Sequence, residues 1–269
     1  MMHLRGNRRW LALPLCLIVM ALRLPMSMLI RFLWPDVTAS VLSYDLAVMA
    51  QEAVLWLLPA LFLWPWRVRR SGSRLPWGTV GAGAVVAGAL IQLSLAALRL
   101  LVPDTSAGTT VPMPQTWPEW ALSLLAVAVM PAVCEEAFFR GCVTAYLKDS
   151  SGNGAALLLG TVLFALMHGD WAALPSHLLV SLGCTLLLLR TGRVWPGMLL
   201  HLGYNAMALV LPLMSGSPWL ALTGLLPLAG AALLIPGMRW RPKGAHLAWT
   251  DWVMLAIILL GEIAGYWLG

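Results

Sequence analysis

The feature that most constrains this chain is a succession of long apolar runs separated by short polar loops. About 20 mainly apolar residues are enough for one helix to cross the hydrocarbon core of a bilayer. With 60% hydrophobic and 10% charged residues among 269, the apolar surface is too large for one water-facing core. We therefore expect an all-α, polytopic transmembrane helical bundle that forms a single integral membrane domain over residues 1–269.

Nine of these runs are candidate spans, so we expect about eight or nine transmembrane helices. The first run follows several arginines, as in a signal peptide, but it continues past Arg23 without a small-residue cleavage site. We interpret it as a retained span. The fifth run is short enough to stop within the membrane. The candidates are residues 10–33, 43–66, 78–102, 117–147, 154–168, 174–190, 194–214, 218–236 and 249–268.

The distribution of basic residues predicts an orientation. Lysine and arginine cluster in alternate loops, whereas the intervening loops carry Asp36, Asp104 and Asp170. Because cytoplasmic loops are enriched in Lys and Arg, we expect a cytoplasmic N-terminus in a bacterial inner (plasma) membrane. The net charge of +6 arises from these loops and not from a basic face with interleaved aromatic residues. We therefore expect a lipid bilayer, and no nucleic acid, as a partner.

Charged residues inside the fourth run are the strongest functional signal. Glu135, Glu136 and Arg140 interrupt an apolar stretch, where each charge costs roughly 2.5–3.5 kcal/mol on insertion scales. Glu136 and Arg140 have i, i+4 spacing, so they can compensate one another on one helix face. Adjacent helical residues point about 100° apart, which leaves Glu135 to face a cavity, either as a neutral buried acid or as a general base.

Histidines in or beside later runs are candidates to join this acid. His168 ends the fifth run, and His201 and Asn205 share one face of the seventh. His177 lies alone in the sixth run, and we interpret it as a hydrogen-bonded core residue. At about 1.5 Å per residue, Glu135, His168 and His201 lie roughly 12–22 Å from the inner ends of their helices. These three groups can therefore converge in a cavity that opens toward the cytoplasm.

The same residues, in this order, resemble the three motifs of the CPBP intramembrane proteases, which include CAAX endopeptidases and bacterial Abi-type proteins. The motifs are Glu135 and Glu136 followed by Arg140, Phe164 followed by His168, and His201 followed by Asn205. They lie in a segment that we interpret as the catalytic core, residues 117–211. The resemblance implies an intramembrane endopeptidase of the glutamic type that cleaves a membrane-associated peptide or protein.

The resemblance also implies a role for each catalytic residue. Glu135 would activate the attacking water, and His168 would hold or polarise that water. His201 and Asn205 would stabilise the oxyanion of the tetrahedral intermediate, which requires donors placed where the charge develops.

The resemblance gives Glu136 and Arg140 a supporting role, in which the pair fixes the helix and biases the ionisation of Glu135. Glu135, His168 and His201 are also a set that could hold zinc with one position left for water. Because the sequence lacks the HExxH spacing of many zinc proteases, we favour a reaction without a metal or other cofactor, with zinc as the alternative.

Two other functions remain open from the residues alone. One is a proton-coupled transporter or channel, since acid–histidine chains form proton relays, although no internal repeat supports it. The other is a non-catalytic immunity protein that binds a peptide. For a protease, candidate substrates are a prenylated tail, a leader peptide or a C-terminal sorting signal. Arg23 and Glu52, both inside predicted spans, either pair with each other or touch the substrate.

Overall fold

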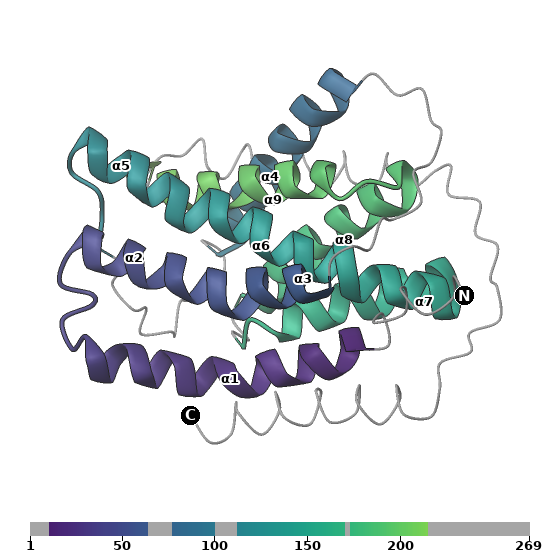
Figure 1. Ribbon diagram of the computed structural model, residues 1–269. Helices are drawn as coiled ribbons and strands as arrows, with labels where there is room; N and C mark the ends of the chain where they lie inside the picture. The colour runs from purple at the N-terminus through teal and green to yellow at the C-terminus, as the bar shows by residue number, and fades with distance from the viewer. Residues whose placement is uncertain (1–10, 64–76, 100–111, 170–172, 215–269) are drawn as a thin grey trace.

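The computed structural model describes residues 11–63, 77–99, 112–169 and 173–214 (Figure 1). These residues form helices joined by short turns, and no strand occurs among them. The all-α prediction is therefore confirmed. The α-helices are α1 (Ala12–Leu33), α2 (Val41–Glu52), α3 (Leu58–Leu63), α4 (Trp77–Arg99), α5 (Trp117–Ser123), α6 (Met130–Phe138), α7 (Thr144–Leu166), α8 (Leu174–Thr191) and α9 (Trp195–Val210).

Short π-helical turns join several of these helices into longer rods. They are η2 (Ala53–Leu57), η3 (Leu124–Val129) and η4 (Phe139–Val143), and a 3-10 turn, η5 (Leu211–Met214), follows α9. Within the described residues, six helical stretches are long and apolar enough to cross a membrane. The chain is therefore an integral membrane protein. The predicted spans 218–236 and 249–268 lie outside the described residues, so the total of eight or nine is not confirmed.

The fourth and fifth predicted spans follow one another without a loop in the stretch Trp117–Leu166. This stretch is interrupted inside α7 at Gly152, whose φ of 86° and ψ of 179° are not helical. Such backbone angles are accessible mainly to glycine, which lacks a Cβ. The Arg140 guanidinium contacts the Phe164 ring, and a Cβ at Gly160 would touch Thr144, so the chain folds back at this turn and the two predicted spans lie side by side.

Helices α4 and α9 approach each other closely because each presents a glycine to the other. A Cβ at Gly88 would lie 1.8 Å from the Leu200 carbonyl oxygen, and a Cβ at Gly203 would lie 2.1 Å from the Val85 carbonyl oxygen. Small residues allow membrane helices to pack backbone against backbone. This contact fixes α9, the helix that carries two of the predicted site residues.

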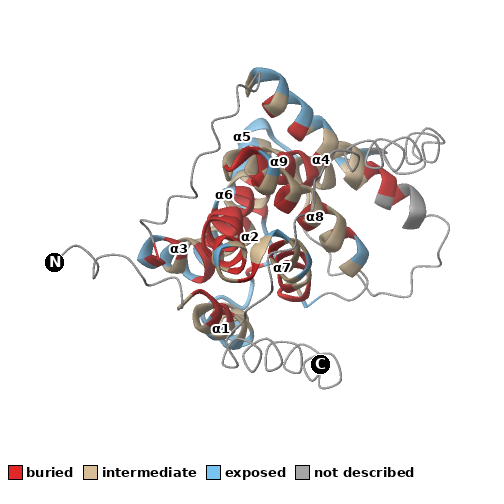
Figure 2. Ribbon diagram, turned by 90° about the vertical axis from the view of Figure 1, so that its right-hand side faces the viewer, coloured by how far each residue is buried: buried red, intermediate tan, exposed pale blue. Residues whose placement is uncertain are grey.

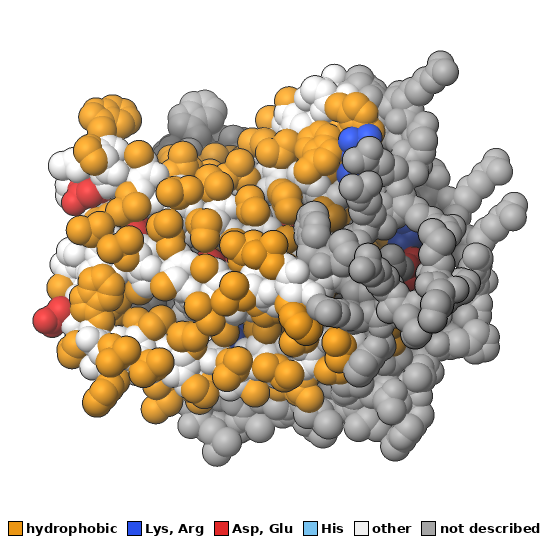
Figure 3. All heavy atoms as spheres, viewed as in Figure 1, with side chains coloured by type: hydrophobic (Ala, Val, Ile, Leu, Met, Phe, Trp, Pro, Cys, Tyr) orange, Lys and Arg blue, Asp and Glu red, His pale blue; other side chains and the backbone are white. Residues whose placement is uncertain are grey.

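The surface and the interior of the bundle differ in the way expected for a protein surrounded by lipid. Buried residues line the inward faces of the helices, most densely around α6 (Figure 2). Apolar side chains cover the face formed by α1, α2 and α5, and few charged atoms are visible on it (Figure 3). Met28 and Phe32 are examples of exposed apolar residues. In a bilayer such side chains can contact lipid tails, which are equally apolar, and they need no protein partner.

The close α4–α9 contact predicts that Gly88→Ala or Gly203→Ala destabilises the protein by about 1–3 kcal/mol, since the added methyl group would overlap a backbone carbonyl. Gly83→Ala is the matched control, because a Cβ at this position of α4 meets nothing within 4 Å. Its effect is expected to stay within about 1 kcal/mol, in the stabilising direction. Thermal unfolding in detergent measures all three, and equal melting temperatures for Gly88→Ala and Gly83→Ala would contradict the prediction.

Candidate active site

The centre of the site is a buried ion pair between Glu136 of α6 and Arg140 of η4. Both side chains are 0% exposed, and Arg140 Nη1 lies 2.9 Å from Glu136 Oε1. Arg140 Nη2 also donates to the carbonyl oxygen and the hydroxyl of Ser181 in α8, at 2.9 and 2.8 Å. The guanidinium carbon lies 4.3 Å from the centroid of the Phe164 ring, a cation–π contact with α7. The pairing that the i, i+4 spacing predicts is thus present, and it joins three helices.

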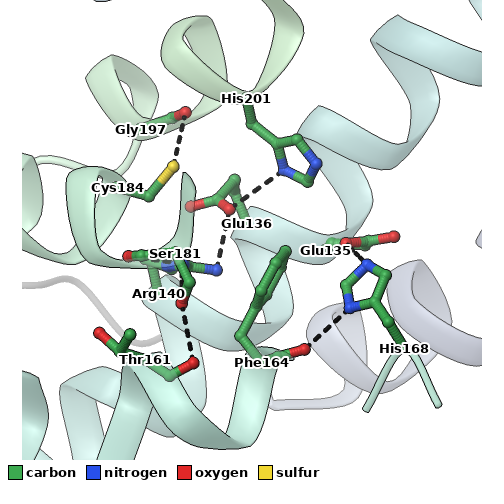
Figure 4. A network of polar contacts seen from close by, with 10 residues as sticks. All are labelled: Glu135, Glu136, Arg140, Thr161, Phe164, His168, Ser181, Cys184, Gly197 and His201. Atoms are coloured by element: carbon green, nitrogen blue, oxygen red, sulfur yellow. Dashed lines mark hydrogen bonds and ion pairs between the residues drawn. The ribbon is translucent and has the colours of Figure 1, made fainter. Parts of the chain in front are cut away.

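His201 of α9 contacts the same carboxylate oxygen. Its Nδ1 lies 3.2 Å from Glu136 Oε1 (Figure 4). Gly197, one turn earlier, leaves space for this carboxylate, because a Cβ there would lie 3.1 Å from Glu136 Oε2. An ionised carboxylate only accepts hydrogen bonds, so Nδ1 of His201 carries the proton in this contact. Nε2, on the other side of the ring, is left for another partner.

His168 faces Glu135, the second acid of α6. His168 Nε2 lies 3.5 Å from Glu135 Oε2, and Glu135 is 6% exposed. The other ring nitrogen, Nδ1, lies 2.8 Å from the Phe164 carbonyl oxygen. Because a carbonyl oxygen only accepts, Nδ1 donates to it, and a neutral ring therefore presents the unprotonated Nε2 to Glu135. His168 Nε2 and the Glu135 carboxylate are then both hydrogen-bond acceptors, so a proton or a water molecule must join them.

Arg23 of α1 holds the backbone of His168 in place. His168 lies beyond the last residue of α7, Leu166, and its carbonyl oxygen accepts a hydrogen bond of 2.6 Å from Arg23 Nη2. Carbonyls at a helix C-terminus lack intrahelical partners, and a basic side chain can satisfy them. From the sequence, the alternatives for Arg23 were a pair with Glu52 or contact with the substrate. Neither of them includes this hydrogen bond.

His177 lies beside the site, although we interpreted it from the sequence as an isolated core residue. Its ring stacks on that of His168, with centroids 3.9 Å apart and planes inclined by 24°. Helix α8 begins at Leu174, which brings its first turn back to the end of α7. The short separation between His168 and the start of the sixth apolar run was the signal that could have revealed this contact.

Asn205 follows His201 by one turn of α9, as its i, i+4 spacing predicts. The side chain is half-buried. The structure thus brings Glu135 together with His168 and Glu136 together with His201, and Asn205 lies one turn beyond this second pair. The roles of these residues remain predictions.

The alternative zinc set does not fit this arrangement. His201 contacts Glu136 and not Glu135, the partner of His168. Throughout the described ranges, no three His, Cys, Asp or Glu side chains are grouped so that they could hold a metal ion. The expectation about cofactors remains a prediction.

A buried acid and histidine inside an apolar helical bundle mark a candidate functional site within the membrane. Residues 117–207 match the sequence model of the type II CAAX prenyl endopeptidase Rce1-like family, and this segment contains all three motifs. The resemblance to the CPBP and CAAX proteases is thereby confirmed for this segment, which is about a third of the chain. No curated protein and no solved structure matches the chain.

The buried ion pair predicts a large loss of stability when one partner is removed. Arg140→Met removes the guanidinium that balances the buried Glu136 charge, and we expect the free energy of unfolding to fall by about 3–5 kcal/mol. The double variant Glu136→Gln/Arg140→Met removes both charges and should recover a large part of the loss. Thermal unfolding in detergent of the single and double variants tests this, and a double variant less stable than Arg140→Met would contradict it.

Proposed function

We propose that the protein cleaves a peptide bond of a membrane-associated peptide or protein with a water molecule activated by Glu135. The observation that carries this proposal is the orientation of His168. Its hydrogen bond to the Phe164 carbonyl turns Nε2 toward the Glu135 carboxyl group, 3.5 Å away. A carboxylate and an imidazole nitrogen that both accept protons are suited to orient a water molecule and to take its proton.

In this mechanism the water oxygen attacks the carbonyl carbon of the scissile bond while Glu135 takes one of its protons. The proton held between Glu135 and His168 Nε2 stays within the site because both groups are largely enclosed by protein. The stacked ring of His177 and the hydrogen bond from Arg23 keep the imidazole of His168 in place. The attack creates a negative charge on the carbonyl oxygen, which needs donors of its own.

Those donors are His201 and Asn205 in our proposal. Nδ1 of His201 is occupied by Glu136, so only Nε2 can donate to the oxyanion, and it does so when the ring carries both protons. The Glu136 carboxylate stabilises that charged form through a charge-assisted hydrogen bond. Asn205 adds amide N–H donors one turn further along α9. Donors fixed in advance by the fold need no reorganisation as the charge develops.

We further propose that the protein lies in a bacterial plasma membrane with its N-terminus and the opening of the site toward the cytoplasm. Arg190 and Arg193 lie at the turn between α8 and α9, whereas Asp36 lies in the turn between α1 and α2, and Glu119 lies in the first turn of α5. This separation supports the orientation because basic residues are enriched on the cytoplasmic side. A prenylated tail, a leader peptide and a C-terminal sorting signal are the substrate classes to test. The family match favours cleavage over transport or passive peptide binding.

Glu135→Gln keeps the shape of the side chain but removes its basicity, and we expect it to lower the rate of cleavage by about 10²–10⁴-fold. The assay uses purified full-length protein in liposomes with quenched fluorescent peptides of the three substrate classes, with and without a chelator. Asp45→Asn is the matched control, since Asp45 is a buried acid that accepts a hydrogen bond of 2.6 Å from Ser123 in another part of the bundle. Cleavage by Glu135→Gln at the wild-type rate would exclude the mechanism, and a chelator effect reversed by zinc would favour the metal alternative.

Asn205→Ala is expected to reduce kcat by about 10²–10³-fold with little change in KM, because it removes a donor to the oxyanion and not a contact with the bound substrate. Steady-state kinetics on the best peptide from the preceding assay gives both constants. A rise in KM at unchanged kcat would instead assign Asn205 to substrate binding.

A further inference from the structure

A third buried acid, Glu52, lies close to the site and has no role in the mechanism so far. It is the last residue of α2, immediately before the π-helical turn η2, and it is 7% exposed. Its Oε2 has no hydrogen-bond partner among the described residues. The Trp56 side chain, one turn later, donates a hydrogen bond to this carboxyl group. Turns of π-helix occur frequently at functional sites, where they redirect side chains.

The packing of η2 against α6 places Glu52 next to Glu135. The Trp56 ring lies 5.7 Å from the Phe138 ring and 5.3 Å from the Phe139 ring, so η2 rests on the turn of α6 that follows Glu135. The carboxyl groups of Glu52 and Glu135 are close enough to interact electrostatically. The Cys134 side chain is near both of them.

Two neighbouring carboxyl groups in an apolar interior cannot both be ionised at low cost, so one of them holds a proton. Glu135 faces His168, which can carry a positive charge. The described partners of Glu52 are a neutral indole and another acid. The proton is therefore expected on Glu52, while Glu135 is free to accept one from water.

A purely structural role explains Glu52 less well than it explains Asp45, which lies seven residues earlier on the same helix. Asp45 is also buried, but the Ser123 hydroxyl donates to it at 2.6 Å. Glu52 leaves one oxygen without such a donor. A buried polar atom without a partner costs about 1–3 kcal/mol, and an ionisable residue kept within a membrane at that cost is a candidate for function.

We propose that Glu52 is the general acid of the reaction, which gives a proton to the leaving amine. This inference rests on the proposed function. Glu135 takes a proton from water as the new C–O bond forms, and Glu52 then protonates the amide nitrogen as the C–N bond breaks. The products are a carboxylic acid and an amine, with Glu135 protonated and Glu52 ionised. Transfer of the proton from Glu135 to Glu52, directly or through a water molecule, restores the starting state.

The test compares two substrates with the same acyl sequence, a peptide amide and an aryl ester. A phenolate leaves without being protonated, whereas an amine does not, so loss of a general acid slows only the amide strongly. We expect Glu52→Gln to lower kcat on the amide by about 10²–10³-fold and on the ester by less than about 10-fold. Glu135→Gln should slow both substrates, and Asp45→Asn should slow neither.

Equal losses on the two substrates, or no loss on the amide, would overturn the proposal for Glu52. Glu52→Met introduces an apolar side chain of similar length and must show the same selective loss. If thermal unfolding shows that Glu52→Gln is not folded, Glu52→Met takes its place in the test. If Glu135→Gln also cleaves both substrates at the wild-type rate, the proposed function itself fails. If only Glu135→Gln is inactive, the proposed function stands without Glu52 as its acid.

Discussion

The buried contact of Arg140 with Glu136 is the interaction on which the rest of the site depends. The guanidinium joins η4 to α8 through Ser181 and to α7 through the Phe164 ring, while the carboxylate binds His201 of α9. Charges enclosed in an apolar bundle are costly unless they have well-placed partners. One ion pair therefore helps to fix the relative positions of α6, α7, α8 and α9. In this way it also holds the motif residues of these helices in place.

Close helix packing and irregular turns supply the rest of that geometry. The glycines of α4 and α9 bring the two backbones together and so fix the height and rotation of His201. Around α6, the π-helical turns η3 and η4 precede and follow the two glutamates, and η2 packs against the same helix. Each π-turn inserts one residue into the helical register, which rotates the following side chains. A regular α-helix would direct Glu135 and Arg140 differently.

Local spacing made part of this site predictable, and packing made the rest unpredictable. The contact between Glu136 and Arg140 follows from i, i+4 geometry, and the length of the apolar runs gave most helix bounds within a few residues. The partner of His201 and the stacking of His177 depend on how each helix is rotated about its axis. Spans that are apolar on every side carry no periodic pattern that reveals this rotation.

The distribution of cations among the acids explains why two adjacent glutamates can serve different purposes. A carboxylate tied to a guanidinium is a poor proton acceptor, because the positive charge stabilises its ionised form. Glu136 contacts both Arg140 and His201, whereas Glu135 faces the imidazole of His168 and lies near the acid Glu52. In the proposed reaction Glu135 takes the proton of the water, whereas Glu136, which is paired with Arg140, orients the imidazole of His201. Structural and chemical functions are thus separated by the 100° between consecutive residues of one helix.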